Sequence, residues 1–141
     1  MVTRSIGDGL IEAMMAIQPR FFVTLEPLPG STVENGSRRV VEWLKRTSHA
    51  AFGKRWSRRP VEERLRAYGF PEHTSSNLHF HLVLGGPDEV LLAAMEGERR
   101  WKALCPGCQF DVGRIENLDA TVRYVLKNNR DPHFMQHFIA F

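Results

Sequence analysis

The clearest alternation of apolar and polar residues lies in residues 78–84. His79 and His81 alternate there with four apolar residues, namely Leu78, Phe80, Leu82 and Leu84. Successive side chains of a β-strand point to opposite faces. The pattern therefore predicts a strand with one apolar face and with both histidines on the other face.

Similar patterns along the rest of the chain predict one domain, residues 1–141, that alternates helices and strands. We expect strands at residues 21–25 and 110–115. Helices are expected at residues 8–18, 37–52, 60–69, 87–104 and 118–127, the last with Asn117 as its N-cap.

The paired histidines are candidate metal ligands. Their imidazole rings would project side by side from the strand, and imidazole nitrogens bind Mn²⁺, Zn²⁺ and similar ions. A site needs a third ligand, and Glu72 or His73, seven and six residues before His79, can supply it from a neighbouring strand or loop. The alternative is a pair of ordinary surface or core histidines.

The predicted helix at 118–127 carries a second candidate. Its apolar stripe, which should pack on the core, consists of Leu118, Val122, Val125 and Leu126. Tyr124 and Lys127 fall on the opposite side, three residues apart and therefore near neighbours. Such a tyrosine is available to a substrate, although a tyrosine merely exposed to solvent is the alternative.

The two candidates together suggest phosphodiester chemistry. A divalent cation can polarise a phosphodiester and stabilise charge on its oxygens. A phenol, with a pKa of about 10, is a weak nucleophile at neutral pH unless an activated phosphate, accurate placement or a nearby base helps it. Lys127 can stabilise developing negative charge. The expected product is a covalent phosphotyrosine at Tyr124.

Composition adds an uneven distribution of charge. The 141 residues carry a formal net charge of +3 and are 43% hydrophobic, enough for one domain with a core. Residues 38–66 contain ten lysines or arginines and three acids, which makes this span +7 and the rest −4. Trp43, Phe52 and Trp56 lie among these charges. Cations beside aromatic rings suit a nucleic-acid strand, whereas rings buried in the core are the alternative.

The basic residues that we expect to bind DNA are Arg38, Arg39, Lys45, Arg46, Lys54, Arg55, Arg58 and Arg59. The chain has no apolar run long enough to span a bilayer, and its N-terminus lacks the order of a secretory signal. A cytoplasmic protein is therefore expected.

Cys105 and Cys108 form a CxxC motif, and His133 and His137 are spaced like the second half of a zinc finger. The 24 residues between Cys108 and His133 exceed the usual length. A tight turn with two partly buried thiols is therefore favoured over a structural zinc site.

Three motifs, in order, resemble those of the HUH endonuclease superfamily, in particular its rolling-circle replication initiators, the Rep proteins. The apolar segment 21–25 looks like the first motif. His79-Phe80-His81 matches the second, a His-hydrophobic-His strand. Tyr124 followed by Lys127 matches the third, a tyrosine with a lysine one helical turn later. The matches span residues 21–127.

The resemblance implies an α+β fold with a central antiparallel sheet flanked by helices, related to ferredoxin-like and RRM folds. It implies a single-tyrosine nickase and ligase in which Tyr124 is the nucleophile, Lys127 assists, and Mn²⁺ or Mg²⁺ is bound by His79, His81 and Glu72. Cleavage would leave a 5′-phosphotyrosine and a free 3′-OH. The implied partners are single-stranded DNA, including an origin hairpin, and host replication proteins, without a membrane.

Several alternatives stay open. The sequence contains no Gly-x-x-x-x-Gly-Lys-Ser/Thr loop of a helicase, and the third ligand is either Glu72 or His73. A transposase-like or relaxase-like HUH enzyme fits the same motifs. In a non-catalytic nucleic-acid-binding module, the histidines and Tyr124 would be incidental. A structural or metal-storage protein would use the histidines and cysteines instead.

Overall fold

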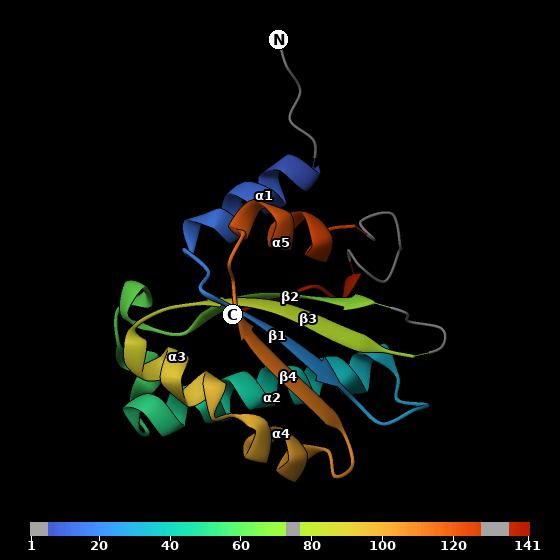
Figure 1. Ribbon diagram of the computed structural model, residues 1–141. Helices are drawn as coiled ribbons and strands as arrows, with labels where there is room; N and C mark the ends of the chain where they lie inside the picture. Colours follow the sequence, from blue (N-terminus) through green and yellow to red (C-terminus); the bar gives the residue numbers. More distant parts are fainter. Residues whose placement is uncertain (1–5, 73–76, 128–135) are drawn as a thin grey trace.

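The computed structural model describes residues 6–72, 77–127 and 136–141, with side chains from residue 8 onward. Its centre is a five-stranded antiparallel sheet in the order β4-β1-β3-β2-β5 (Figure 1). The strands are β1 (Phe21–Glu26), β2 (Arg66–Glu72), β3 (His79–Gly85), β4 (Gln109–Arg114) and β5 (Ile139–Ala140). The predicted α+β class with a central antiparallel sheet is confirmed.

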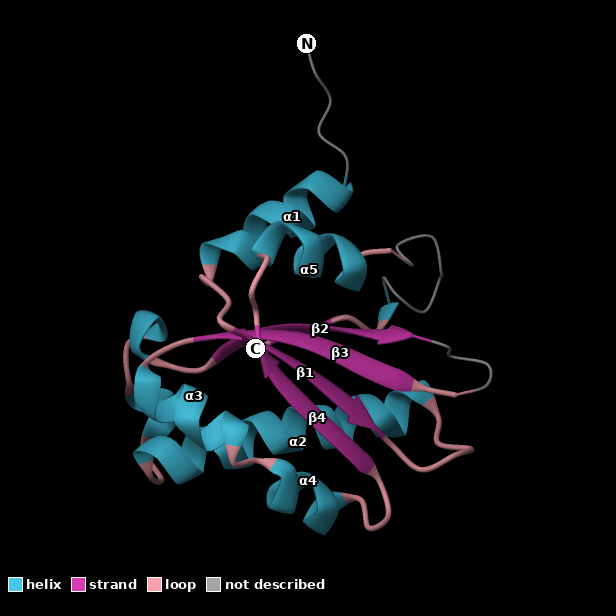
Figure 2. Cartoon of the chain, in the orientation of Figure 1, coloured by secondary structure: helices cyan, strands magenta, loops and turns pink. Residues whose placement is uncertain are grey.

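Helices cover both faces of this sheet (Figure 2). One face is covered by α1 (Ile6–Ala16) and α5 (Leu118–Val125). The other is covered by α2 (Val33–Phe52), α3 (Asp88–Met95) and α4 (Glu98–Leu104). Two short 3₁₀ turns, η1 (Trp56–Arg58) and η2 (Val61–Glu63), connect α2 to β2. The sheet is therefore the middle of three layers.

The pairing register decides which side chains share a face. Thr24 of β1 and Phe70 of β2 are both paired with His81 of β3, and Glu72 is paired with His79. Directly paired residues of neighbouring strands point to the same side of a sheet. These side chains therefore lie together on the α1/α5 face, and the prediction that the two histidines share one face is confirmed.

The two faces have cores of unequal size. On the α2 side, a large cluster joins the helix to alternate residues of β1 and β3, with Val40, Trp43, Leu44, Val23, Leu25, Phe80, Leu82 and Leu84 fully buried. On the α1/α5 side, the buried cluster is limited to Met14, Ile17, Phe70, Val83, Val122, Val125 and Leu126. The smaller cluster leaves one end of this face to polar residues.

Two helices differ from their predictions: one begins earlier than predicted, and the other is divided in two. The helix predicted from residue 37 begins at Val33, because the Thr32 hydroxyl accepts a hydrogen bond from the Asn35 amide and caps it. The single helix predicted at 87–104 is wrong: α3 and α4 are separated at Gly97. The carbonyl of Gly97 accepts a hydrogen bond from the buried Trp43 indole at 2.9 Å, and this tertiary contact fixes the break.

The helix predicted at 60–69 is also wrong. Residues 66–72 form β2, and Tyr68 lies on a strand rather than on a helix. Pairing with β3 explains the difference, because it uses the backbone of the whole segment. At Gly69 a β-carbon would lie 2.9 Å from Leu82 Cγ, so glycine there permits close packing and does not end a helix.

The CxxC motif closes the turn between α4 and β4. The Cys108 amide donates a hydrogen bond to the Cys105 carbonyl at 3.0 Å, and a disulfide joins the two sulfur atoms. The tight turn is confirmed, and the two cysteines form a disulfide rather than the expected pair of thiols. His137 lies 3.5 Å from Glu34, and His133 lies outside the described residues.

None of the helices in the described ranges combines the length and apolar character needed to cross a membrane.

Gly97→Ala should destabilise the protein by about 1–3 kcal/mol, because an added β-carbon would lie 2.6 Å from the buried Trp43 ring and 2.9 Å from the Ala94 carbonyl. Gly9→Ala is the matched control: nothing lies within 4 Å of that position in α1, so it should stabilise the protein by about 0.5–1 kcal/mol. Urea unfolding measures both. Equal effects of the two substitutions would contradict the packing at Gly97.

Candidate functional site

Helix α5 is capped at its N-terminus and packs one side on the sheet. The Asn117 side chain accepts a hydrogen bond from the Ala120 amide at 3.0 Å and caps the helix. Val122 and Val125 are buried against the smaller core. The helix ends at Val125, two residues earlier than predicted, so Lys127 lies in the turn that follows. Tyr124 stays outside the core, with 45% of its surface exposed.

Tyr124 lies beside His81. Their ring centroids are 5.5 Å apart, in an edge-to-face arrangement. Phe22 of β1 completes the group, since its ring stacks on His81 at 5.4 Å and meets the Tyr124 ring edge-on at 6.1 Å. The fold therefore brings together a helix residue and a strand residue that are 43 positions apart in the sequence.

Glu72 connects this pair to Lys127. The carboxylate is 5% exposed, with one oxygen 2.5 Å from His81 Nε2 and the other 2.7 Å from Lys127 Nζ. Lys127 Nζ also lies 3.9 Å from the centroid of the Tyr124 ring. One buried carboxylate thus links two adjacent strands to the end of the tyrosine helix.

Charge and burial set the protonation of these groups. Burial alone raises the pKa of Glu72, but the hydrogen bond from Lys127 and the charges of His81 and Lys127 outweigh it and lower the pKa. The pKa of Lys127 is raised, chiefly by its hydrogen bond to Glu72. Burial lowers the pKa of His81 more than Glu72 raises it. At neutral pH the expected state is an ionised Glu72, a neutral His81 and an ammonium on Lys127.

The Nδ1 atoms of both histidines have partners of their own. His79 Nδ1 lies 2.6 Å from the Asn77 carbonyl, which can only accept, so Nδ1 carries the hydrogen. His81 Nδ1 shares a 3.1 Å hydrogen bond with the Thr24 hydroxyl. Each Nε2 faces a carboxylate instead: His79 Nε2 lies 3.2 Å from Glu26 and His81 Nε2 lies 2.5 Å from Glu72.

The polar side chains at this end of the sheet are of the types that bind divalent cations. Two imidazole nitrogens and two carboxylates, from Glu26 and Glu72, share this end of the sheet. The Nε2 atoms of both imidazoles lie on the side of these carboxylates. Within the described ranges, no three His, Cys, Asp or Glu side chains are arranged as a metal site. Each imidazole is instead paired with its own carboxylate.

The structure brings together most of the residues singled out from the sequence, namely Glu72, His79, His81, Tyr124 and Lys127. His73 lies outside the described residues. Sequence reasoning missed Phe22, Thr24 and Glu26, which alternate along β1 and share the face of the histidines. That alternation is visible in the sequence, but only the pairing with β3 assigns it to this face.

The predicted DNA-binding residues do not surround Tyr124. Most of them lie on α2, behind the sheet, or in the turns after it, and three have partners within the protein. Arg39 contacts the Cys105 sulfur, Arg46 pairs with Glu42, and Arg59 packs over the Phe52 ring. The Trp43 indole is fully buried, so for this ring the core interpretation is confirmed.

A surface pocket of about 370 Å³ opens beside Tyr124 on the β4 side of α5. Its lining includes Phe22, Asp111, Arg114, Asn117 and Tyr124. The phenol is therefore reached from solvent without displacement of the core.

Comparison of the chain with protein-family models, curated proteins and solved structures found no match in any of the three.

Acidification should destabilise the metal-free protein where His81 titrates. The pKa of His81 lies below its usual 6.5 in the folded state, so the unfolded chain takes up this proton first as the pH falls. The stabilisation is therefore complete above about pH 6.5 and is lost as the pH falls toward the folded pKa. Urea unfolding in EDTA should show a decreasing free energy of unfolding from pH 7 to pH 5, and His81→Gln should flatten this slope.

Glu72 acts in the same direction at lower pH. Its pKa is below 4.5 in the folded state, so its contribution is present above that value and is lost as the pH falls through the folded pKa. His49→Gln, which removes an exposed histidine from α2, is the control. If His81→Gln leaves the slope between pH 7 and pH 5 unchanged, the assignment of that slope to His81 is wrong.

Proposed function

We propose that the protein is a metal-dependent endonuclease that nicks and rejoins single-stranded DNA, with Tyr124 as the nucleophile. The observation that carries the proposal is the contact of an exposed phenol with His81, beside a lysine and a buried carboxylate. Hydroxyl, imidazole, carboxylate and ammonium groups at one accessible point are suited to transfer of a phosphodiester.

The proposed reaction is a transesterification in which the number of phosphoester bonds is conserved. The Tyr124 oxygen attacks the phosphorus, a bond forms between them, and the bond from phosphorus to the 3′-oxygen breaks. The phenol loses its proton and the departing 3′-oxygen gains one. The products are a 5′-phosphotyrosine and a free 3′-OH, and the reverse reaction rejoins the strand.

Lys127 has an electrostatic role in this proposal. Its raised pKa keeps it as an ammonium at neutral pH, so it cannot act as a general base there. Its position 3.9 Å from the Tyr124 ring centroid suits stabilisation of negative charge on the phenolic oxygen. Glu72 keeps Lys127 in place through the 2.7 Å contact.

His79, His81 and Glu72 would hold the cation, Mn²⁺ or Mg²⁺, and Glu26 is a further candidate ligand. When bound, the cation would polarise the phosphodiester and offset charge on its non-bridging oxygens. The hydrogen bonds at Nδ1 of the two histidines orient both rings with Nε2 toward the carboxylates. Coordination by His81 Nε2 would require its hydrogen to move to Nδ1, where the Thr24 hydroxyl can accept it. The Thr24 hydroxyl is then a positioning group.

The motif order and the antiparallel sheet support an HUH-like enzyme of the Rep type, acting in rolling-circle replication in the cytoplasm. A transposase-like or relaxase-like enzyme would use the same residues. The contacts of both histidines with carboxylates favour a second candidate, a non-catalytic module in which this cluster only stabilises the fold. The two candidates differ in whether the protein becomes linked to DNA.

Tyr124→Phe should abolish a covalent protein–DNA adduct, because it removes the attacking oxygen and keeps the ring. The substrate is a pool of random-sequence single-stranded oligonucleotides labelled at the 3′ end, incubated with Mn²⁺ and separated under denaturing conditions. The label stays with the protein because the 3′ fragment carries the linked 5′-phosphate. Wild-type protein should form a labelled band that EDTA prevents.

Tyr68→Phe is the matched control, since Tyr68 is the other of the two tyrosines, and it should retain the adduct. An adduct that persists in Tyr124→Phe would refute the assignment of the nucleophile. DNA binding without any adduct in the wild-type protein would favour the non-catalytic module.

Glu72→Gln should lower the affinity for Mn²⁺ by about tenfold or more, because the substitution removes a carboxylate near the ion. Glu26→Gln should have a smaller effect, because the Glu26 side chain is 24% exposed and that of Glu72 only 6%, and a charge nearer to water interacts more weakly with a bound ion. Isothermal titration calorimetry measures both variants. The opposite order of the two effects would assign the third ligand to Glu26 instead.

A further inference from the structure

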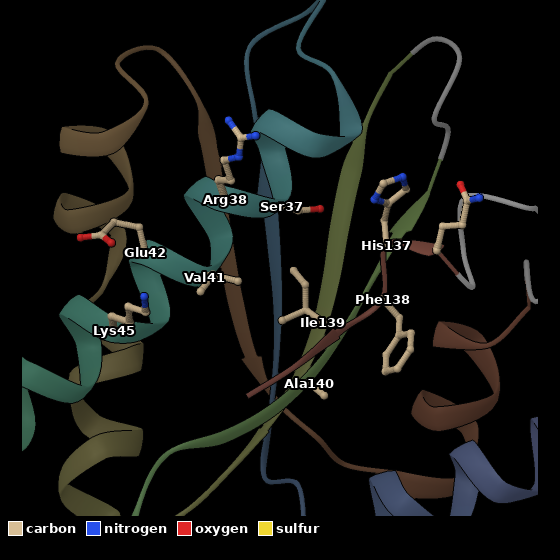
Figure 3. Close-up of a pocket in the computed structure, with 10 residues that line it drawn as sticks. Ser37, Arg38, Val41, Glu42, Lys45, His137, Phe138, Ile139 and Ala140 are labelled. Atoms are coloured by element: carbon tan, nitrogen blue, oxygen red, sulfur yellow. The ribbon is translucent and has the colours of Figure 1, made fainter. Parts of the chain in front are cut away.

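A groove of about 560 Å³ lies between α2 and the last residues of the chain, at the edge of the sheet formed by β5 (Figure 3). Its helical wall consists of Ser37, Arg38, Val41, Glu42 and Lys45. Its other wall is formed by residues 136–140, which include β5 at the edge of the sheet. None of these residues takes part in the proposed chemistry.

The cations of this groove are not neutralised by the residues that the structure describes. Arg38 and Lys45 are exposed and make no ion pair or side-chain hydrogen bond with another residue in the described part of the chain. Glu42, the acid on the same wall, is paired with Arg46 at 3.1 Å. Arg38 and Lys45 are seven residues apart, about 10 Å along the helix. They can therefore bind two separate anionic groups.

An aromatic ring in the groove suits a nucleotide strand. Phe138 is 38% exposed and its ring stacks on Phe70 at 6.2 Å. A partly exposed ring supported from behind is a platform on which a base can stack.

Phe138 also connects the groove to the candidate site. Phe70 belongs to β2, two residues before Glu72, and both side chains lie on the α1/α5 face. A strand that leaves the Tyr124 site along β2 and passes the edge of the sheet at β5 would therefore reach Phe138 and then the α2 cations. This route joins the Tyr124 site to the α2 cations, which the sheet otherwise separates.

We propose that the groove between α2 and β5 binds the single DNA strand next to the cleaved phosphate, an inference that rests on the proposed function. Arg38 and Lys45 bind successive parts of the phosphate backbone, and Phe138 stacks on a base. Arg39, Arg46 and Arg59, which have internal partners, lie outside this binding surface. An acidic peptide would satisfy the two cations but would make no use of the Phe138 ring.

The test is the salt dependence of binding to a fluorescent 20-nucleotide oligothymidylate, measured by anisotropy in EDTA so that no cleavage occurs. Each lost phosphate contact should reduce the slope of log K against log salt by about 0.7. The double variant Arg38→Ala/Lys45→Ala should therefore lose about 1.4 of slope and at least tenfold in affinity. Phe138→Ala should weaken binding at least fivefold with little change of slope.

The control is Arg20→Ala/Lys102→Ala, which removes the same charge from exposed residues paired with Asp88 and Glu98. It should keep the wild-type slope. Circular dichroism checks that all variants are folded. The proposal is overturned if the groove variant and the control have equal slopes, or if Phe138→Ala binds the oligothymidylate as tightly as the wild-type protein does.

These results are independent of the adduct assay. If wild-type protein forms the adduct but the groove variant binds DNA like the control, the proposal for the groove is wrong and the proposed nuclease function is retained. If the groove variant has a smaller salt-dependence slope but the wild-type protein forms no adduct, the groove binds DNA and the proposed nuclease function is wrong.

Discussion

The carboxylate of Glu72 is the interaction on which the arrangement of this face depends. It is buried between His81 on the neighbouring strand and Lys127 beyond α5. A buried carboxylate is costly unless it is paired and hydrogen-bonded, so both partners are needed for the fold to tolerate it. The same contacts hold the end of the tyrosine helix over the sheet. One ion-paired group therefore sets the distance between Tyr124 and the histidines.

The unequal cores of the two faces explain why a polar cluster can exist here. Most of the apolar burial, and hence most of the hydrophobic stabilisation, lies between the sheet and α2. The α1/α5 face is only partly filled by apolar side chains. Its remaining end holds His79, His81, Glu26 and Glu72, at the end of the sheet where β1 and β2 finish. The stability of the fold does not depend on an apolar cover over this end.

Sequence reasoning predicted those parts of the structure that local patterns encode. The alternation around His79 and His81 identified their strand, and the stripe around Val122 identified α5 and left Tyr124 outside the core. It failed where long-range pairing decides the conformation. Residues 66–72 were predicted as helix, yet they pair with β3, and the short β5 has too few residues to show a pattern.

The candidate site was predicted in its residues but not in its connections. Glu26 and Thr24 belong to the cluster only because β1 pairs with β3 in one register, which no local pattern reveals. The approach of Lys127 to Glu72 likewise depends on how α5 lies over the sheet.

The central claim is that the phenol of Tyr124 becomes bonded to DNA, and locating the bond tests it most directly. After reaction with single-stranded DNA and Mn²⁺, the protein is digested with nuclease and trypsin and its peptides are analysed by mass spectrometry. Trypsin cleaves after Arg123 and Lys127, which places Tyr124 in the peptide Tyr-Val-Leu-Lys, residues 124–127. The account predicts a nucleotide mass on this peptide. A nucleotide on any other peptide, or cut DNA with every peptide unmodified, would contradict it.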